Sequence, residues 1–196
     1  MHFVHIEDFF LPSAGYQINL LSKLQVQQGH EVTIVTSELD KVPTYYTNFF
    51  GKEPSKDAKF TEQTGVKIVR VAILGFYSGR SIYYPSIFKI VDSLQPDVLF
   101  VHGEDTLIGM QYIRRYHKLK YPMVLDCHMV EVASINRFRK IYRIFYRNFI
   151  APIIIKNDIP LIRVMDTDYV EQCLGIPLSK TVYLSLGTDT SHFQPN

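Results

Sequence analysis

Short runs of apolar, β-branched residues recur along this chain and alternate with longer segments of helical spacing. We predict strands at the apolar runs 2–6, 31–36, 66–71, 97–102, 122–127, 160–164 and 181–186. Most runs are apolar at consecutive rather than alternate positions, which is typical of strands buried on both faces. The pattern therefore predicts a parallel sheet of about six or seven strands.

Helical spacing separates most of these runs, with apolar residues repeating every three or four positions. The predicted apolar stripes are Tyr16, Leu20, Leu21 and Leu24; Tyr84, Ile87, Phe88, Val91 and Leu94; and Ile108, Tyr112, Tyr116 and Leu119. Gly29 stands where the first helix needs a left-handed residue to end. Strands joined by helices of this length predict a Rossmann-like, three-layer α/β fold with helices on both faces of the sheet.

The segment 37–65 departs from this alternation because it is polar and interrupted by proline and glycine. We predict a long excursion there, on the same sheet edge as His128. Long loops at strand ends often carry function.

Composition narrows the class of protein. The 196 residues are 46% hydrophobic and 20% charged, as in a folded globular protein, and the net charge of +2 gives no sign of a nucleic-acid partner. Cys127 and Cys173 fit no metal or redox spacing. The first residues already read as a strand, and no apolar run is long enough to span a bilayer. We therefore expect a cytoplasmic protein without a membrane-spanning segment.

In a parallel sheet of this kind, ligands bind beyond the carboxyl ends of the strands. The first such loop, 7–15, contains Gly15 but neither a G-x-G-x-x-G nor a P-loop pattern, which argues against a dinucleotide or triphosphate site. Gly15 opens a helix whose free amides could face an anion or a sugar hydroxyl. The alternative is a glycine that only permits a tight turn.

Four stretches, in this order and spacing, resemble the family-four glycosyltransferases. They are "PSAGYQINLLSKLQVQQGHEVTIVTSE", "LQPDVLFVHG", "YPMVLDCHMV" and "LGIPLSKTVYLSLGTDTSHFQP". These are retaining, nucleotide-sugar-dependent enzymes with the two-domain GT-B fold. The resemblance implies that 1–196 is one Rossmann-like N-terminal domain, the acceptor-side half, which ends at an interdomain linker at about 187–196. It also implies that the C-terminal, donor-binding domain is the missing partner.

The resemblance further implies a UDP- or GDP-sugar donor, no cofactor in this half, and a sugar or lipid-linked acceptor of bacterial surface-polysaccharide or glycolipid synthesis. This half alone is then expected to be inactive, because the paired glutamates of the donor domain are absent from the chain. Besides the missing glutamates, the chain departs from the family pattern at Ala14-Gly15, where the family often has two glycines. Two alternatives stay open: a stand-alone Rossmann-like binding module without catalysis, and a different small-molecule α/β enzyme, such as a flavodoxin-like protein.

The resemblance assigns the catalytic position to His128, which follows the strand 122–127 and matches a histidine that approaches the reacting sugar. A neutral imidazole there can donate or accept a hydrogen bond as charge builds on the leaving phosphate. The alternative is a histidine that only packs at the strand end. Asp126 is expected to fix this histidine or a neighbouring loop. The family reaction needs no carboxylate pair, because the leaving phosphate itself helps to deprotonate the acceptor.

Further candidates for substrate binding follow other strands. They are Asp8, Gly15 and Tyr16 in the first loop, and His102, Gly103 and Glu104 after the strand 97–102. The alternative for the second group is an ordinary turn with Asp105 or Thr106 as the helix N-cap. Asp189 is expected to cap a turn in the tail. The segment 166–168, Asp-Thr-Asp, resembles a D-x-D metal motif, but we interpret Asp166 or Thr167 as a helix start and predict no metal site.

A basic, aromatic, amphipathic helix is predicted at 134–152. Its apolar stripe, which we expect to pack in the core, is Ile135, Phe138, Tyr142, Phe145 and Phe149. The opposite side carries Arg137, Lys140, Arg143 and Arg147. Such a face suits an anionic membrane or a phosphate-bearing acceptor, and would place the protein on the inner face of the plasma membrane. The alternative is an ordinary solvated basic face.

Overall fold

The computed structural model describes residues 1–44, 55–129, 137–185 and 187. The chain divides into two compact units, one of Met1–Leu99 with Gly187–Asn196, and one of Phe100–Leu186. Each unit is described by itself. The predicted interdomain linker at 187–196, with Asp189, lies outside the described residues except for Gly187.

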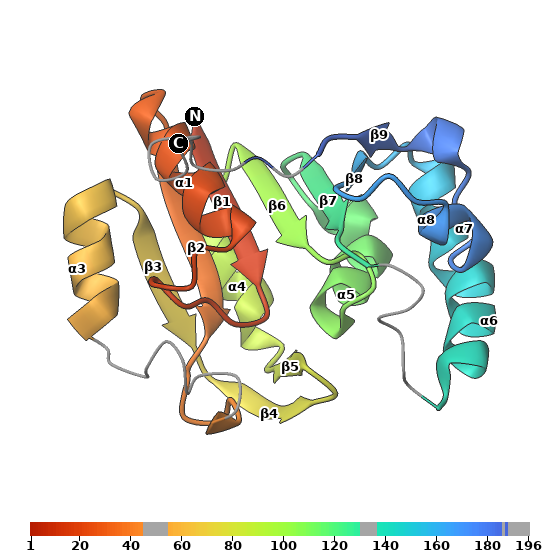
Figure 1. Ribbon diagram of the computed structural model, residues 1–196, viewed down its shortest axis with the longest axis horizontal. Coiled ribbons are helices and arrows are strands. Elements are labelled where there is room, and N and C mark those ends of the chain that lie inside the picture. Colours follow the sequence, from red (N-terminus) through yellow and green to blue (C-terminus); the bar gives the residue numbers. More distant parts are fainter. Residues whose placement is uncertain (45–54, 130–136, 186, 188–196) are drawn as a thin grey trace, which may run out of the picture. The chain divides into compact units, whose positions relative to one another are not determined.

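The first unit is built on three parallel strands, β1 (His2–Glu7), β2 (Glu31–Ser37) and β3 (Lys67–Val71). Its helices are α1 (Gln17–Gln27), α3 (Ser55–Thr64) and α4 (Ser86–Ser93) (Figure 1). His5 lies opposite Ile34, and Ile34 lies opposite Ile68, so these three residues point to one face of the sheet.

Helices cover both faces of this three-stranded part. On one face, α1 and α3 close a core that contains Phe10, Ile18, Val32, Ile34, Phe60 and Val66. On the other face, His2 reaches Thr33 Oγ1 through Nε2 (2.9 Å) and donates through Nδ1 to the carbonyl oxygen of Leu94 at the end of α4 (3.0 Å). The predicted three-layer arrangement is confirmed for this unit.

Helix α1 packs through a different face from the predicted one. Tyr16 and Leu24 of the predicted stripe are exposed, whereas Ile18, Asn19, Ser22 and Gln25 are buried. Asn19 Nδ2 donates to the carbonyl oxygens of Leu11 and Pro12, both at 3.1 Å. Gln25 Oε1 accepts from His5 Nε2 at 2.8 Å. Hydrogen bonds to buried polar groups therefore orient this helix, and apolar spacing alone could not reveal them.

Three elements of the first unit, one helix and two strands, were not predicted. Helix α3 lies within the segment 37–65 that the sequence assigned to an excursion. Strands β4 (Ile73–Tyr77) and β5 (Arg80–Tyr83) form an antiparallel hairpin. Ser78 and Gly79 both have positive φ, as the tight two-residue turn of a hairpin requires. The Ser-Gly pair between two apolar runs was the signal for this turn.

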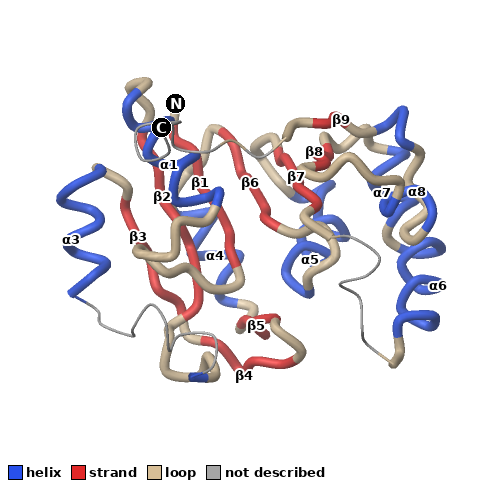
Figure 2. The backbone as a smooth tube through the Cα atoms, in the orientation of Figure 1, coloured by secondary structure: helices blue, strands red, loops and turns tan. Residues whose placement is uncertain are grey.

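The second unit contains most of β6 and all later elements (Figure 2). These are β6 (Val98–His102), α5 (Leu107–Arg115), the 3₁₀ turn η1 (Tyr116–Lys118), β7 (Met123–Cys127), α6 (Arg139–Phe149), α7 (Ala151–Lys156), β8 (Leu161–Arg163), α8 (Tyr169–Gln172), the 3₁₀ turn η3 (Leu178–Lys180) and β9 (Val182–Tyr183). Strands β7, β8 and β9 pair in parallel.

The seven predicted strands all exist, and they form one sheet in the order β3-β2-β1-β6-β7-β8-β9. The Rossmann-like α/β fold class is therefore confirmed. The start of α8 differs from the expectation, because Asp168 rather than Asp166 or Thr167 is the N-cap, and Asp166 lies 3.8 Å from Arg163 in an ion pair. Within the described residues, no helix has the length and apolar character needed to cross a membrane.

Helix α6 contradicts the prediction that its aromatic stripe packs in the core. Phe138, Phe145 and Phe149 are exposed, and Ile135 lies outside the described residues. The tyrosines hold the helix instead: the hydroxyl of Tyr142 donates to the carbonyl oxygen of Asp105 (2.8 Å), and that of Tyr146 to the carbonyl oxygen of Glu104 (3.4 Å). Since these bonds turn the tyrosine edge inward, the phenylalanine edge faces outward.

Candidate active site

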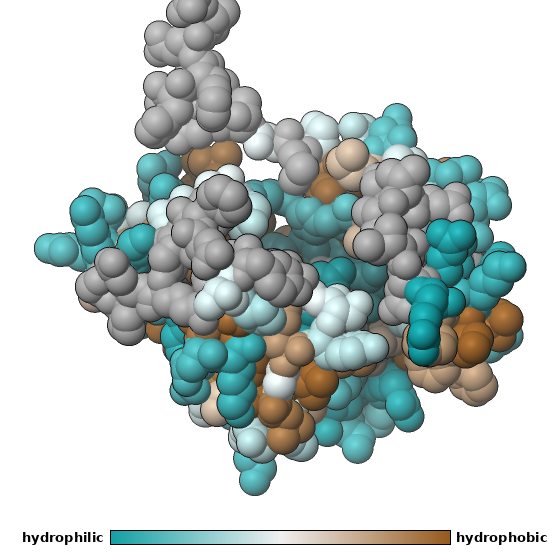
Figure 3. All heavy atoms as spheres, turned by 60° about the horizontal axis from the view of Figure 1, so that its bottom comes forward, coloured by the Kyte–Doolittle hydropathy of each residue, from teal (hydrophilic) through white to brown (hydrophobic). Residues whose placement is uncertain are grey.

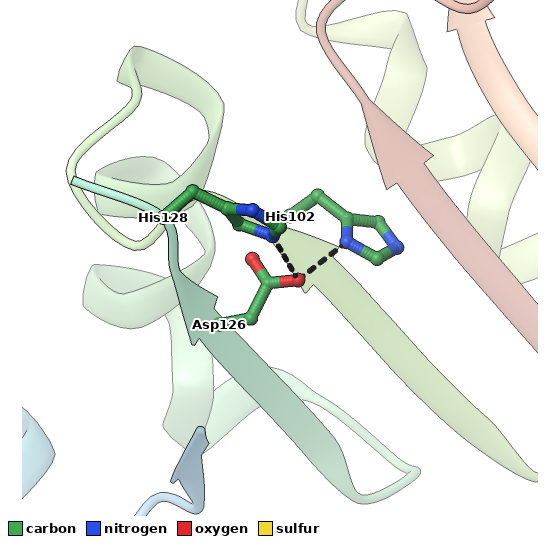
Figure 4. A group of neighbouring side chains, drawn as sticks. All are labelled: His102, Asp126 and His128. Carbon is green, nitrogen blue, oxygen red and sulfur yellow. Dashed lines mark hydrogen bonds and ion pairs between the residues drawn. The ribbon is translucent and has the colours of Figure 1, made fainter. Parts of the chain in front are cut away.

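Two histidines of the second unit converge on one carboxylate oxygen of Asp126 at the carboxyl ends of β6 and β7 (Figure 4). His102 is the last residue of β6, and its Nδ1 lies 2.6 Å from Oδ2 of Asp126, near the end of β7. His128 follows β7 directly, and its Nε2 lies 3.1 Å from the same Oδ2. The backbone amide of Gly103 donates to the second oxygen, Oδ1, at 2.8 Å. The carboxylate thus accepts three hydrogen bonds.

These contacts fix the charge of Asp126 and the tautomers of both histidines. Burial would raise the pKa of the Asp126 carboxyl, but His102 and then His128 hold this pKa below its ordinary value. An ionised carboxylate can only accept hydrogen bonds. His102 must therefore donate from Nδ1 and His128 from Nε2, which leaves Nδ1 of a neutral His128 as a bare acceptor.

The two histidines differ in access. The side chain of His102 is 4% exposed, whereas that of His128 is 40% exposed. The His102 ring also stacks on Phe100, with ring centroids 4.7 Å apart. Of the two imidazoles, His128 is the one that a substrate can touch, and His102 serves to hold Asp126 in place.

The turn that follows β6 requires a glycine at position 103, because of both its backbone conformation and the space around its α-carbon. Gly103 has φ of +81°, and a Cβ added there would lie 2.5 Å from Cγ2 of Thr106. Thr106 is the N-cap of α5, and its Oγ1 accepts from the amide of Gly109 at 2.9 Å. The N-cap named in the alternative interpretation is therefore present, as Thr106, and the same turn places the Gly103 amide against Asp126.

Glu104, the third candidate after β6, points into the interior. It is fully buried, and neither carboxyl oxygen makes a hydrogen bond of ordinary geometry with a described residue. Burial and then the neighbouring Asp105 raise the pKa of this carboxyl well above its usual range. Burial and Glu104 likewise raise the pKa of the Cys127 thiol. A group so enclosed cannot contact a substrate in this conformation.

The candidates of the first loop lie in the first unit, where Asp8 has a local role. Its Oδ1 accepts from the amide of Ser81 (3.2 Å), and its Oδ2 lies 3.7 Å from Arg80. These contacts tie the end of β1 to the β4–β5 hairpin. Gly15 has positive φ and open space around its α-carbon, and Tyr16 is the exposed N-cap of α1. Substrate contacts of Asp8, Gly15 and Tyr16 stay a prediction.

His102, Asp126 and His128 also form the one group among the described residues whose ligand atoms could hold a metal ion, since those atoms lie within 4.8 Å of one another. However, one nitrogen of each imidazole, Nδ1 of His102 and Nε2 of His128, is directed at the same oxygen of Asp126. A cation would have to replace both hydrogen bonds. One nitrogen of each histidine is thus already paired with Asp126, and the absence of a metal stays a prediction.

Sequence reasoning missed the link between His102 and Asp126. It placed His102 in the cleft as a substrate contact and expected Asp126 to fix His128 or a neighbouring loop, without pairing it with His102. The available signal was the combination of a polar His at the end of one apolar strand and a polar Asp inside the next apolar strand. Two polar groups that are buried at strand ends are expected to pair with each other.

Comparison with protein families matches residues 14–156 to Glycosyltransferase Family 4. The chain belongs to glycosyltransferase family 4. This confirms the expected family, with its transferase-type N-terminal domain of GT-B fold. Comparison with curated proteins finds no match to the chain.

Two solved structures share the fold of this family-4 chain. Anabaena HepE (Alr3699), solved in complex with UDP and glucose, is 11% identical with a TM-score of 0.53; the match covers 97% of this chain and 46% of HepE. A putative 2-keto-3-deoxygluconate kinase from Enterococcus faecalis is 11% identical with a TM-score of 0.50, over 89% of this chain and 61% of the kinase. At this identity the likeness concerns the fold alone. The chain spans about half the length of HepE.

Proposed function

We propose that this family-4 chain is the acceptor-side half of a retaining glycosyltransferase that uses a nucleotide sugar, and that His128 is its catalytic residue. The observation that carries the proposal is the arrangement at the ends of β6 and β7. One half-exposed imidazole is held by a buried carboxylate, at the sheet edge where folds of this class bind ligands.

The chemistry proposed for His128 follows from its tautomer. With Nε2–H donated to Asp126, Nδ1 presents a lone pair that accepts a hydrogen bond from a sugar hydroxyl. Such a bond fixes the orientation of the reacting sugar, and fixed orientation is a large part of enzymatic rate enhancement. Asp126 and His102 are positioning residues, because they act on the reaction through His128.

The donor is proposed to be a UDP- or GDP-sugar held mainly by a separate C-terminal domain. The acceptor is proposed to be a sugar or a lipid-linked sugar of bacterial surface-polysaccharide or glycolipid synthesis. HepE, which shares the fold, was crystallised with UDP and glucose, and this supports the choice of donor class without fixing it.

The test is a transfer assay on the protein that joins this chain to its donor-binding domain. We expect transfer from one member of a panel of UDP- and GDP-sugars, with the anomeric configuration retained in NMR spectra of the product. Calorimetry on the 196-residue chain alone should show no micromolar binding of any panel member, because the donor is proposed to be held mainly by the other domain. Micromolar affinity corresponds to a binding free energy of about 8 kcal/mol. Inverted product would refute the retaining mechanism. Micromolar binding to the isolated chain would mean that the donor site lies in this half. Absence of transfer by the joined protein would favour a stand-alone binding module.

A further inference from the structure

The surface of α6 combines exposed apolar side chains with basic ones. Its apolar edge consists of Phe138, Ile141, Ile144, Phe145 and Phe149, of which Ile141, Ile144 and Phe149 are more than 60% exposed. Apolar side chains of this size are normally buried when they are neighbours on one helix. In Figure 3, brown and teal spheres lie side by side at the right, the side on which Figure 1 shows α6.

The apolar edge is ordered by contacts within the helix. The rings of Phe145 and Phe149 stack, with centroids 5.4 Å apart. The guanidinium of Arg137 lies over the ring of Phe138, at 4.6 Å from its centroid. The helix is anchored by the buried Tyr146 and by Tyr142, whose hydroxyls donate to backbone carbonyl oxygens. The outward direction of the apolar edge is therefore set by the packing of the second unit.

Basic residues flank this edge, and acidic residues are absent from the sequence between positions 132 and 157. Arg137, Arg139, Lys140 and Arg147 are exposed. Arg143 is half-buried, with Nε and Nη2 inaccessible to solvent, so it belongs to the packed side rather than to the surface assigned to it from the sequence. The exposed face of α6 thus presents positive charge next to hydrocarbon.

We propose that this face of α6 binds the surface of an anionic lipid bilayer, with the apolar edge inserted among the acyl chains and the basic flank against the lipid phosphates. A helix of this kind lies in the interface plane, and both forces contribute. Pairing with a second copy of the chain is disfavoured, because a two-fold contact along α6 would bring the basic flanks together. In the part of the chain that the structure describes, no helix is long and apolar enough to cross a bilayer.

The test is co-sedimentation of the 196-residue chain with vesicles of 70% phosphatidylcholine and 30% phosphatidylglycerol, compared with pure phosphatidylcholine. We expect more than about 25-fold stronger partitioning into the anionic vesicles, at roughly fivefold per basic residue, and a decrease at 0.5 M salt. The double variant Arg137→Gln/Lys140→Gln should bind anionic vesicles about 25-fold more weakly, at roughly fivefold per basic residue near such a surface. The separate variant Phe145→Ser/Phe149→Ser should weaken binding more than the Arg137→Gln/Lys140→Gln variant does, and should leave a residual, salt-sensitive attachment.

Lys59→Gln/Lys89→Gln is the matched control, because it removes the same charge from exposed positions of α3 and α4. It should bind as the wild type does. Equal binding to both vesicle types, no binding, or an equal loss in the control would overturn the proposal. So would a dimer in light scattering that Phe145→Ser dissolves, because a second copy would then cover this face. The measurement contains no sugar, so its outcome is independent of the proposed transferase activity.

Discussion

Two buried carboxyl groups, Glu104 in the turn after β6 and Asp126 in the neighbouring strand β7, have contrasting surroundings. Asp126, on the side of the turn that faces His128, accepts hydrogen bonds from two imidazoles and one amide. Glu104, on the interior side, has no hydrogen-bonded partner of ordinary geometry among the described residues. Both groups are fully buried, yet the pKa of Asp126 is lowered and that of Glu104 is raised. Depth of burial therefore does not decide the charge of a carboxyl group; its partners do.

The contrast assigns different roles to the two sides of the turn. An ionised carboxylate can hold an imidazole in one tautomer, as the serine-protease aspartate does for its histidine. A neutral carboxylic acid in the interior adds no charge to the site and makes the fold sensitive to rising pH. Each of the following experiments tests one side of this comparison.

The largest effect is expected for His128→Ala in the protein that includes the donor-binding domain. Losing the group that orients the reacting sugar is expected to lower kcat about 10²-fold, the typical cost of misplacing a reacting group by about 1 Å. The Tm should change little, because this side chain is half-exposed. His117→Ala is the matched control, as it removes an exposed histidine from η1. Unchanged kcat in His128→Ala would remove this residue from the site.

A second effect concerns the stability of the second unit. Asp126→Ala leaves His102 buried without its partner, and removing one member of a buried pair costs about 3–5 kcal/mol of unfolding free energy. Because the folded-state pKa of Asp126 is lowered, its contribution is present above the pH at which exposed aspartates titrate, about 4, and is lost as the pH falls. The difference between variant and wild type in urea denaturation should therefore shrink in acid. A difference that persists unchanged at pH 2 would contradict this account.

The opposite pH dependence is expected for Glu104→Gln. The raised folded-state pKa means that the stability contributed by this carboxyl is full below about pH 4 and is lost as the pH rises. Glutamine keeps the shape and cannot ionise, so the variant should match the wild type at pH 4 and exceed its unfolding free energy by about 1–3 kcal/mol at pH 8. Chemical denaturation at the two pH values measures this. A destabilised variant at pH 8 would show that the Glu104 carboxylate is paired in solution.

Much of the fold was readable from the sequence, because strands buried on both faces have continuous apolar runs, and all seven such runs became strands. The same logic failed for α1 and α6. In α1, Asn19 and Gln25 are buried through specific hydrogen bonds, which a count of apolar positions treats as surface. In α6, Tyr142 and Tyr146 bind carbonyl oxygens, so the aromatic stripe splits into a packed edge and an exposed edge.

The candidate site was predicted in part. His128 lies where a residue after an apolar strand must lie, at the carboxyl end of the sheet, and Asp126 holds it as expected. The roles of His102 and Glu104 were not readable. Neighbouring residues of one turn point to opposite sides, and only the backbone geometry at Gly103 decides which side each takes. A list of polar residues after a strand cannot make this distinction.

The smallest effect, a single proton position, gives the most direct test of the central claim that Asp126 sets the tautomer of His128. The imidazole ¹⁵N chemical shifts of the 196-residue chain at pH 8, where ordinary imidazoles are neutral, report which nitrogen carries the proton. We predict a protonated Nε2 and a bare Nδ1 for His128, with the reverse tautomer for His102. In Asp126→Ala, His128 should become a mixture of both tautomers. A wild-type His128 protonated at Nδ1, or a tautomer unaffected by the loss of Asp126, would contradict the account.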